Sequence, residues 1–203
     1  MRLVADQISA MRAGRTVVSG LSFALSDGQG LLLTGPNGSG KTTLLRVIAG
    51  FLPPSAGAVR LEGAADDDVS ANVHFIGHLP QTKAGLTVRE NLDFEAGFLG
   101  NGSGKVVDTA MARLGLADLG DIRAGYLSAG QRRRVALARL LVAKRPIWLL
   151  DEPSVSLDQA STGVLAALIG EHRAQGGLVI AATHIPLGLT DAGELKLGAK
   201  VAA

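Results

Sequence analysis

Cysteine is absent from the 203 residues of this sequence. Disulfides, thiolate zinc sites, haem attached through cysteine and thiol redox chemistry are therefore excluded. No apolar run approaches the roughly 18 residues of a membrane-spanning helix, and Asp6 and Gln7 interrupt the N-terminal stretch where a signal peptide would be apolar. We therefore expect a chain that works in a reducing compartment and stays outside the bilayer.

Charged residues are also scarce. They make up 19% of the sequence, apolar residues make up 47%, and the basic excess is only +2. A disordered chain would have the opposite balance, and so small an excess predicts no nucleic-acid partner. The 27 glycines follow no Gly-X-Y period and no longer unit repeats. The sequence therefore predicts a single globular domain.

Apolar runs typical of strands alternate with helical patterns along most of the chain. The runs are short and uninterrupted, as in strands that are buried on both faces of a parallel sheet. The predicted strands are 31–33, 147–150 and 178–182, and the predicted helices are 41–49, 88–98, 106–114, 128–143 and 157–172. This alternation predicts an α/β fold.

Two regions depart from the alternation. Residues 16–25, 58–61 and 73–76 are short extended patterns with no long helix between them, and they predict a smaller, partly antiparallel sheet. Residues 86–139 are almost wholly helical, which predicts a helical insertion into the α/β core.

A glycine-rich segment lies between the first buried strand and the first helix. It matches the pattern G-x-x-x-x-G-K-[ST] at every fixed position. Its residues are Gly35, Pro36, Asn37, Gly38, Ser39, Gly40, Lys41 and Thr42. Glycines let successive backbone N–H groups point inward, and the following helix N-terminus favours negative charge. The segment therefore predicts a binding loop for the phosphates of ATP.

Three side chains at the end of this loop complete the predicted site. Lys41 would neutralise the β and γ oxygens of the nucleotide. Thr42 would offer its hydroxyl to Mg²⁺, and Thr43 would donate a hydrogen bond to a phosphate. ATP and Mg²⁺ are thus the predicted cofactors.

A second glycine-rich segment, at 100–105, has a similar sequence but lacks two fixed residues of the pattern. Leu99 stands where the opening glycine should be, and Val106 replaces the hydroxyl residue that binds magnesium. We therefore predict a loop between two helices at this place and not a second nucleotide site.

Two adjacent carboxylates follow the predicted strand at 147–150. Ligands of open α/β sheets bind at the carboxyl ends of strands, and successive side chains of a strand point in opposite directions. Asp151 is therefore predicted to hold Mg²⁺, and Glu152 is predicted to accept a proton from, or orient, the water that attacks the γ-phosphorus.

The sequence Leu-Ser-Ala-Gly-Gln at 127–131 opens an amphipathic helix. Ser128 is a favourable N-cap residue followed by small residues, so this is a second helix start that can bind an anion. The basic run 132–134 that follows is predicted to be a solvated helix face, because no aromatic side chain interleaves it.

The segment 127–131 resembles the signature motif of ATP-binding-cassette (ABC) ATPases, and the resemblance covers essentially the whole chain. It includes the phosphate loop and the acidic strand end, segment 156–158, which resembles the loop that touches the opposite subunit, and His184, which resembles the switch histidine near the γ-phosphate. The resemblance implies a P-loop NTPase (RecA-like) core with a parallel sheet, an N-terminal partly antiparallel β subdomain and a helical ABC subdomain. The implied parts of the single domain 1–203 are 1–85, 86–139 and 140–203.

The resemblance also implies partners. Two copies would face each other head to tail, so that Ser128, Gly130 and Gln131 of one copy close over the ATP in the phosphate loop of the other. Integral membrane permease subunits would hold this pair at the cytoplasmic face of the inner membrane. Glu152 and His184, together with the loop lysine, would be the catalytic residues.

Two positions depart from the family pattern. The sensor loop normally carries Gln, but an ungapped count places His78 there while Gln81 lies further along, and either could be a neighbour of Mg²⁺. The aromatic residue that usually stacks on adenine is missing, because Met11, Arg12 and Ala13 occupy that region. We expect weak stacking, or Arg12 packed on the ring.

Gly77-His78 and the segment 181–187 are similar to ATPase subunits of the haem-handling ABC complex of cytochrome c maturation. This implies a role in energising haem export or the release of a haem chaperone. Direct haem binding is not expected, because histidine is scarce and cysteine is absent.

Other functions remain as alternatives. One is the ATPase subunit of another ABC transporter. A second is a soluble ABC ATPase that acts on ribosomes or DNA, but such proteins usually need tandem cassettes, a long coiled-coil insertion or basic arms. A third, a small-molecule kinase with a phosphate loop, would leave residues 127–131 unexplained.

Overall fold

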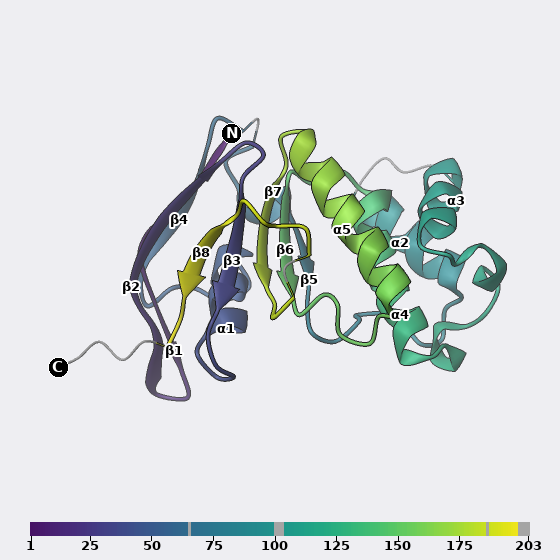
Figure 1. Cartoon of the computed structure of the whole chain (residues 1–203), viewed down its shortest axis with the longest axis horizontal. Helices are drawn as coiled ribbons and strands as arrows, with labels where there is room; N and C mark the ends of the chain where they lie inside the picture. Colours follow the sequence, from purple (N-terminus) through teal and green to yellow (C-terminus); the bar gives the residue numbers. More distant parts are fainter. Residues whose placement is uncertain (65, 100–103, 186, 199–203) are drawn as a thin grey trace.

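The computed structural model describes residues 1–64, 66–99, 104–185 and 187–198. These residues form two sheets and several helices arranged side by side (Figure 1). An antiparallel sheet lies at one side, a parallel sheet lies in the middle, and helices α2 to α4 lie at the opposite end. The predicted α/β class is confirmed.

The parallel sheet has the strand order β5-β6-β7-β3-β8, and its neighbouring strands all run in the same direction. The strands are β3 Gly30–Thr34, β5 Val73–Ile76, β6 Ile147–Asp151, β7 Leu178–Ala182 and β8 Gly193–Lys196. The three predicted core strands are therefore confirmed. Strand β8 has no strand signal in the sequence, because it is an edge strand with only one large apolar side chain.

The antiparallel sheet has the strand order β2-β1-β4. Its strands are β1 Arg2–Arg12, β2 Arg15–Ser26 and β4 Ala56–Glu62. The extended patterns at 16–25 and 58–61 are confirmed in this sheet, but the prediction that 73–76 lies beside them is wrong. That segment is β5, which pairs in parallel with β6. All four of its side chains are buried, and a parallel sheet covered on both faces provides that burial.

Helices pack on both sides of the parallel sheet. They are α1 Lys41–Ile48, α2 Val88–Leu99, α3 Gly104–Arg113, α4 Ala129–Val142 and α5 Gln159–Ala174, with 3₁₀ turns at Ser70–Asn72, Ala117–Leu119 and Ala124–Tyr126. The five predicted helices are confirmed to within a few residues at each end. In the part of the chain that the structure describes, no helix is long and apolar enough to cross a membrane.

The predicted loop at 100–105 falls largely outside the described residues, because 100–103 are not among them. Helix α2 ends before this segment, and Gly104 and Lys105 begin α3.

Strand β6 separates two hydrophobic cores. Its side chains Ile147 and Leu149 belong to the core shared with α1 and the antiparallel sheet. Trp148 and Leu150 belong to the core shared with α2, α4 and α5. Because side chains alternate along a strand, one buried strand serves both cores. The sheet thereby fixes α1 on one face and α4 and α5 on the other.

Candidate active site

The glycine-rich loop joins the end of β3 to the start of α1. Gly35 has φ +134°, and a Cβ at this position would collide with the carbonyl of Leu197. Gly40, the N-cap of α1, has φ +101°, and a Cβ there would lie 2.6 Å from the carbonyl of Val17. Only glycine fits both the backbone conformation and these close approaches. The loop can therefore curl tightly around the N-terminus of the helix.

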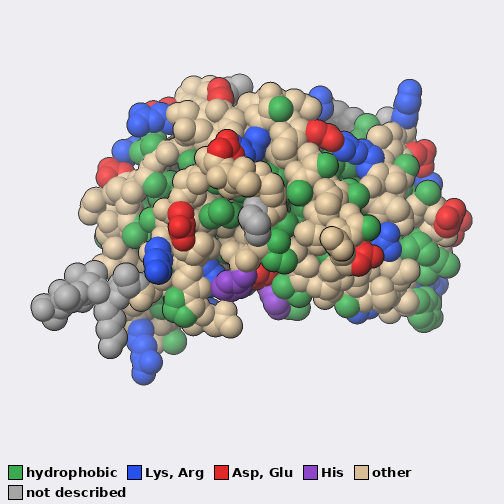
Figure 2. Space-filling model, in the orientation of Figure 1, with side chains coloured by type: hydrophobic (Ala, Val, Ile, Leu, Met, Phe, Trp, Pro, Cys, Tyr) green, Lys and Arg blue, Asp and Glu red, His purple; other side chains and the backbone are tan. Residues whose placement is uncertain are grey.

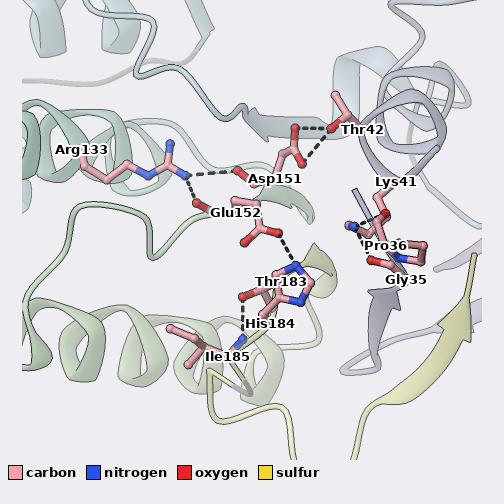
Figure 3. A network of polar contacts seen from close by, with 10 residues as sticks. All are labelled: Gly35, Pro36, Lys41, Thr42, Arg133, Asp151, Glu152, Thr183, His184 and Ile185. Carbon is pink, nitrogen blue, oxygen red and sulfur yellow. Dashed lines mark hydrogen bonds and ion pairs between the residues drawn. The ribbon is translucent and has the colours of Figure 1, made fainter. Parts of the chain in front are cut away.

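Lys41 lies inside this curl. Its Nζ donates to the carbonyls of Gly35 at 2.6 Å and Pro36 at 3.1 Å (Figure 3), and its side chain is buried. Ser39 Oγ is also buried and has no hydrogen-bond partner within the described residues. A buried ammonium and an unsatisfied hydroxyl beside a helix N-terminus suit the oxygens of a phosphate.

Thr42 and Asp151 meet across the site (Figure 3). Thr42 Oγ1 donates to Asp151 Oδ2 at 2.9 Å and lies 3.1 Å from Oδ1. Asp151 is only 3% exposed. A hydroxyl and a carboxylate are oxygen ligands of the kind that Mg²⁺ takes, with substrate phosphates usually completing its shell. The pair therefore fits the predicted Mg²⁺ site.

Glu152 points away from Asp151 and toward His184 (Figure 3). Glu152 Oε1 lies 3.5 Å from His184 Nε2. The amide of Ile185 donates to Thr183 Oγ1 at 3.1 Å, which fixes the turn that carries the histidine. Glu152 has φ +48°, an uncommon value for a residue with a Cβ. The two adjacent carboxylates thus take different directions, as expected at a strand end.

Lys41, Thr42, Asp151 and Glu152 line one cavity of about 340 Å³, and His184 is not among its described lining residues. Its walls include loop residues 37–43, Asp151 and Glu152, together with Arg12 and His78. Figure 2 shows histidine side chains close together at the surface, beside an acidic side chain. The structure thus brings the phosphate loop and the acidic pair to one place, and it puts Arg12 at the same cavity.

Comparison with known proteins identifies the family. The family model described as ABC transporter matches residues 18–155. The chain belongs to the ABC transporter family. The cytochrome c biogenesis ATP-binding export protein CcmA of Mesorhizobium japonicum is 49% identical to it over 98% of both chains. The protein of the same name from Rhizobium meliloti is 48% identical over 97% of this chain and 98% of its own.

Solved structures of ABC proteins share the fold. An ABC transporter ATP-binding protein from Pyrococcus furiosus has a TM-score of 0.83 and 25% identity, over 97% of this chain and 98% of its own. A nucleotide-free ATP-binding cassette from an ABC transporter has a TM-score of 0.79 and 24% identity, over 97% of this chain and 88% of its own. The chain is thus an ABC-type ATPase.

The ABC signature segment lies at the start of α4. Gln131 N donates to Ser128 Oγ at 3.2 Å, and Ser128 N donates to Gln131 Oε1 at 2.8 Å, so the two residues form a capping box. Ser128 is exposed. Among the described residues that line the phosphate cavity, Ser128, Gly130 and Gln131 do not occur. The cavity of one chain therefore contains one of the two predicted anion-binding helix starts.

The prediction that residues 132–134 form a solvated helix face is wrong for Arg133. This residue is only 2% exposed, because it shares a helix face with Leu137 and Leu140, which are buried in the core. Burial lowers the pKa of the guanidinium, and the negative charges of Asp151 and Glu152 oppose that shift. The helical spacing of the apolar residues in α4 was the sequence signal that could have predicted the burial of Arg133.

The two candidates for the sensor-loop position lie in different surroundings. His78 lines the phosphate cavity. Gln81 Oε1 instead accepts from Arg139 Nη1 at 3.3 Å, and Arg139 Nη2 donates to Glu95 Oε1 at 2.5 Å. Gln81 is thus connected to α4 and α2, whereas His78 faces the nucleotide side.

Replacing each candidate in turn tests this separation. We expect His78→Ala to lower ATP hydrolysis by the purified chain about tenfold, because it removes a polar group from the cavity wall. Gln81→Ala should mainly reduce the stimulation of hydrolysis by membrane partners, because it loosens the contact with α2 and α4. Hydrolysis is measured with and without those partners in lipid vesicles. If only Gln81→Ala changes the intrinsic rate, the ungapped count that places His78 at the sensor position is wrong.

Proposed function

We propose that this chain is the ATP-hydrolysing subunit that energises haem export, or the release of a haem chaperone, in cytochrome c biogenesis. The observation that carries the proposal is the one cavity shared by the phosphate loop, Thr42, Asp151 and Glu152. The pathway is supported by relatives named cytochrome c biogenesis ATP-binding export proteins, which are 46% to 49% identical over nearly the whole chain. Haem as the cargo is supported by the resemblance of Gly77-His78 and of residues 181–187 to the ATPase subunits of haem-handling ABC complexes.

ATP is the substrate of the proposed reaction. The loop amides, Lys41 and Thr43 bind its phosphates. Thr42 and Asp151 would hold Mg²⁺, which would neutralise charge on the phosphate oxygens. Glu152 accepts a proton from the attacking water, while the water oxygen bonds to the γ-phosphorus and the bond to the bridging oxygen of ADP breaks. His184 lies beside Glu152 to contact the γ-phosphate.

A second copy of the chain completes each site in this proposal. Ser128, Gly130 and Gln131 form a helix start outside the phosphate cavity of their own chain, and the positive end of a helix favours an anion. This segment of one copy contacts the γ-phosphate that Lys41 of the other copy holds. Hydrolysis removes the shared contact and opens the pair. The pair docks on integral membrane permease subunits at the cytoplasmic face of the inner membrane.

Glu152→Gln tests the assignment of the water-orienting residue. We expect this variant to bind ATP normally and to hydrolyse it at least about 100-fold more slowly, because an amide cannot accept the proton of the attacking water. Its ATP-bound form should accumulate as dimers. Steady-state hydrolysis and light scattering with ATP measure the two effects. Unchanged hydrolysis would remove Glu152 from this role.

Mixing two inactive variants tests the shared site. Lys41→Ala damages the phosphate loop and Ser128→Arg blocks the signature helix start, so each variant alone should be inactive. A mixed dimer contains one undamaged site, and the mixture should therefore recover part of the hydrolysis. Lys41→Ala mixed with Glu152→Gln is the matched control, because both changes lie on the loop side and no undamaged site can form. Equal activity in the two mixtures would contradict a site built from two copies.

Affinity capture from detergent-solubilised membranes tests the pathway. The tagged chain should co-purify with integral membrane subunits that handle haem, which mass spectrometry identifies, and the tag alone serves as control. Capture of an unrelated permease would favour another ABC transporter. Recovery mainly with ribosomes or DNA would favour the soluble class and refute the proposed role.

A further inference from the structure

The guanidinium of Arg133 connects two segments of the active site, residues 151–153 and the segment that begins at Gly77. Nε donates to Pro153 O at 2.8 Å, and Nη1 donates to Gly77 O at 2.6 Å. Nη2 donates to Asp151 O at 3.2 Å and also to Glu152 O (Figure 3). These donors end on main-chain carbonyls, so Arg133 acts on the path of the backbone itself.

Space filling alone does not require arginine at this position. A buried charged group is costly unless its donors are bound, and Leu137 on the same face of α4 packs in the core without any charge. The neighbouring Arg134 takes the ordinary position of an arginine, where it is partly exposed and donates to the carbonyls of Leu114 and Gly115. Burial of Arg133 is therefore explained by its hydrogen bonds to the active-site backbone and not by packing.

The carbonyls of Asp151, Glu152 and Pro153 converge on this one cation. In an extended strand successive carbonyls point to opposite sides, so they converge only where the strand is broken. The φ of +48° at Glu152 is that break. It carries conformational strain, and the converging carbonyl dipoles repel one another. The planar fork of donors in arginine stabilises such an arrangement, because it presents several N–H groups in fixed directions.

From these contacts we infer that Arg133 is a positioning residue for ATP hydrolysis. It holds the turn at Glu152 in the conformation that aims the carboxylate toward the attacking water, and it ties that turn to the start of the sensor loop at Gly77. Ser128 caps the helix that carries Arg133, so a shift of the signature segment reaches the turn through one side chain. Arg133 can act in this way only if Glu152 orients the water, and the inference therefore rests on the proposed function.

Two substitutions of Arg133 test its role against a matched control. Arg133→Gln removes the cation and most of the donors, whereas Arg133→Lys keeps the charge but cannot reach both segments with a fixed fork of donors. We expect Arg133→Gln to lower kcat about 100-fold through misplacement of Glu152. Arg133→Lys should be intermediate. KM for ATP and the Kd of a non-hydrolysable ATP analogue should change by no more than about twofold, because the phosphate loop is intact. Arg134→Gln on the same helix should keep the wild-type kcat.

A double variant tests whether Arg133 acts through Glu152. If it does, adding Arg133→Gln to Glu152→Gln lowers the single-turnover rate no further. A multiplicative loss in the double variant overturns the inference, as does a wild-type kcat in both Arg133 variants. The inference is also overturned if both Arg133 variants lose nucleotide binding and no longer unfold cooperatively. Arg133 would then be required for the stability of the whole fold. Wild-type hydrolysis by Glu152→Gln alone would instead refute the proposed function, so the two failures are distinguishable.

Discussion

Strand β6 is buried along its whole length, and this burial decides where chemistry can occur in the molecule. Its side chains alternate between two hydrophobic cores, so polar groups without partners would be costly within it. The carboxylates of Asp151 and Glu152 therefore come where the strand ends. Strands β3 and β7 run in the same direction and end at the same edge, where Thr42 and His184 follow them. Parallel pairing thus gathers side chains that are far apart in the sequence.

The two anion-binding helix starts differ in which groups surround them. The start of α1 is enclosed by the phosphate loop, with Lys41 buried in the curl. The start of α4 is capped by its own Ser128 and Gln131 and lies outside that cavity. A site that needs both starts must draw on two copies of the chain. In the proposed arrangement, ATP binding and association are therefore thermodynamically linked, because each stabilises the other.

The location of the site could be predicted from the sequence more fully than the fold around it. The loop 35–42 and the acidic pair carry their chemistry in local spacing, and the structure brings both to one cavity. The sheet that contains 73–76 could not be predicted, because four buried residues show no alternation that would separate a parallel from an antiparallel strand. Strand β8 could not be predicted from the sequence for another reason. It pairs through backbone hydrogen bonds, which nearly any sequence supplies.

Arg133 shows where local patterns conflict. Its position between two other arginines favours the surface, whereas its place on the apolar face of α4 favours the core. The core position prevails because the broken strand at Glu152 offers converging carbonyls that bind a cation. A fold selected for packing alone would place an apolar side chain there, since burial of an ion pair or charge is weak evidence for stability. Such conflicts between local rules are expected where function constrains the backbone. Burial of this guanidinium costs free energy, and its hydrogen bonds to the turn at Glu152 explain that cost better than packing in the core does.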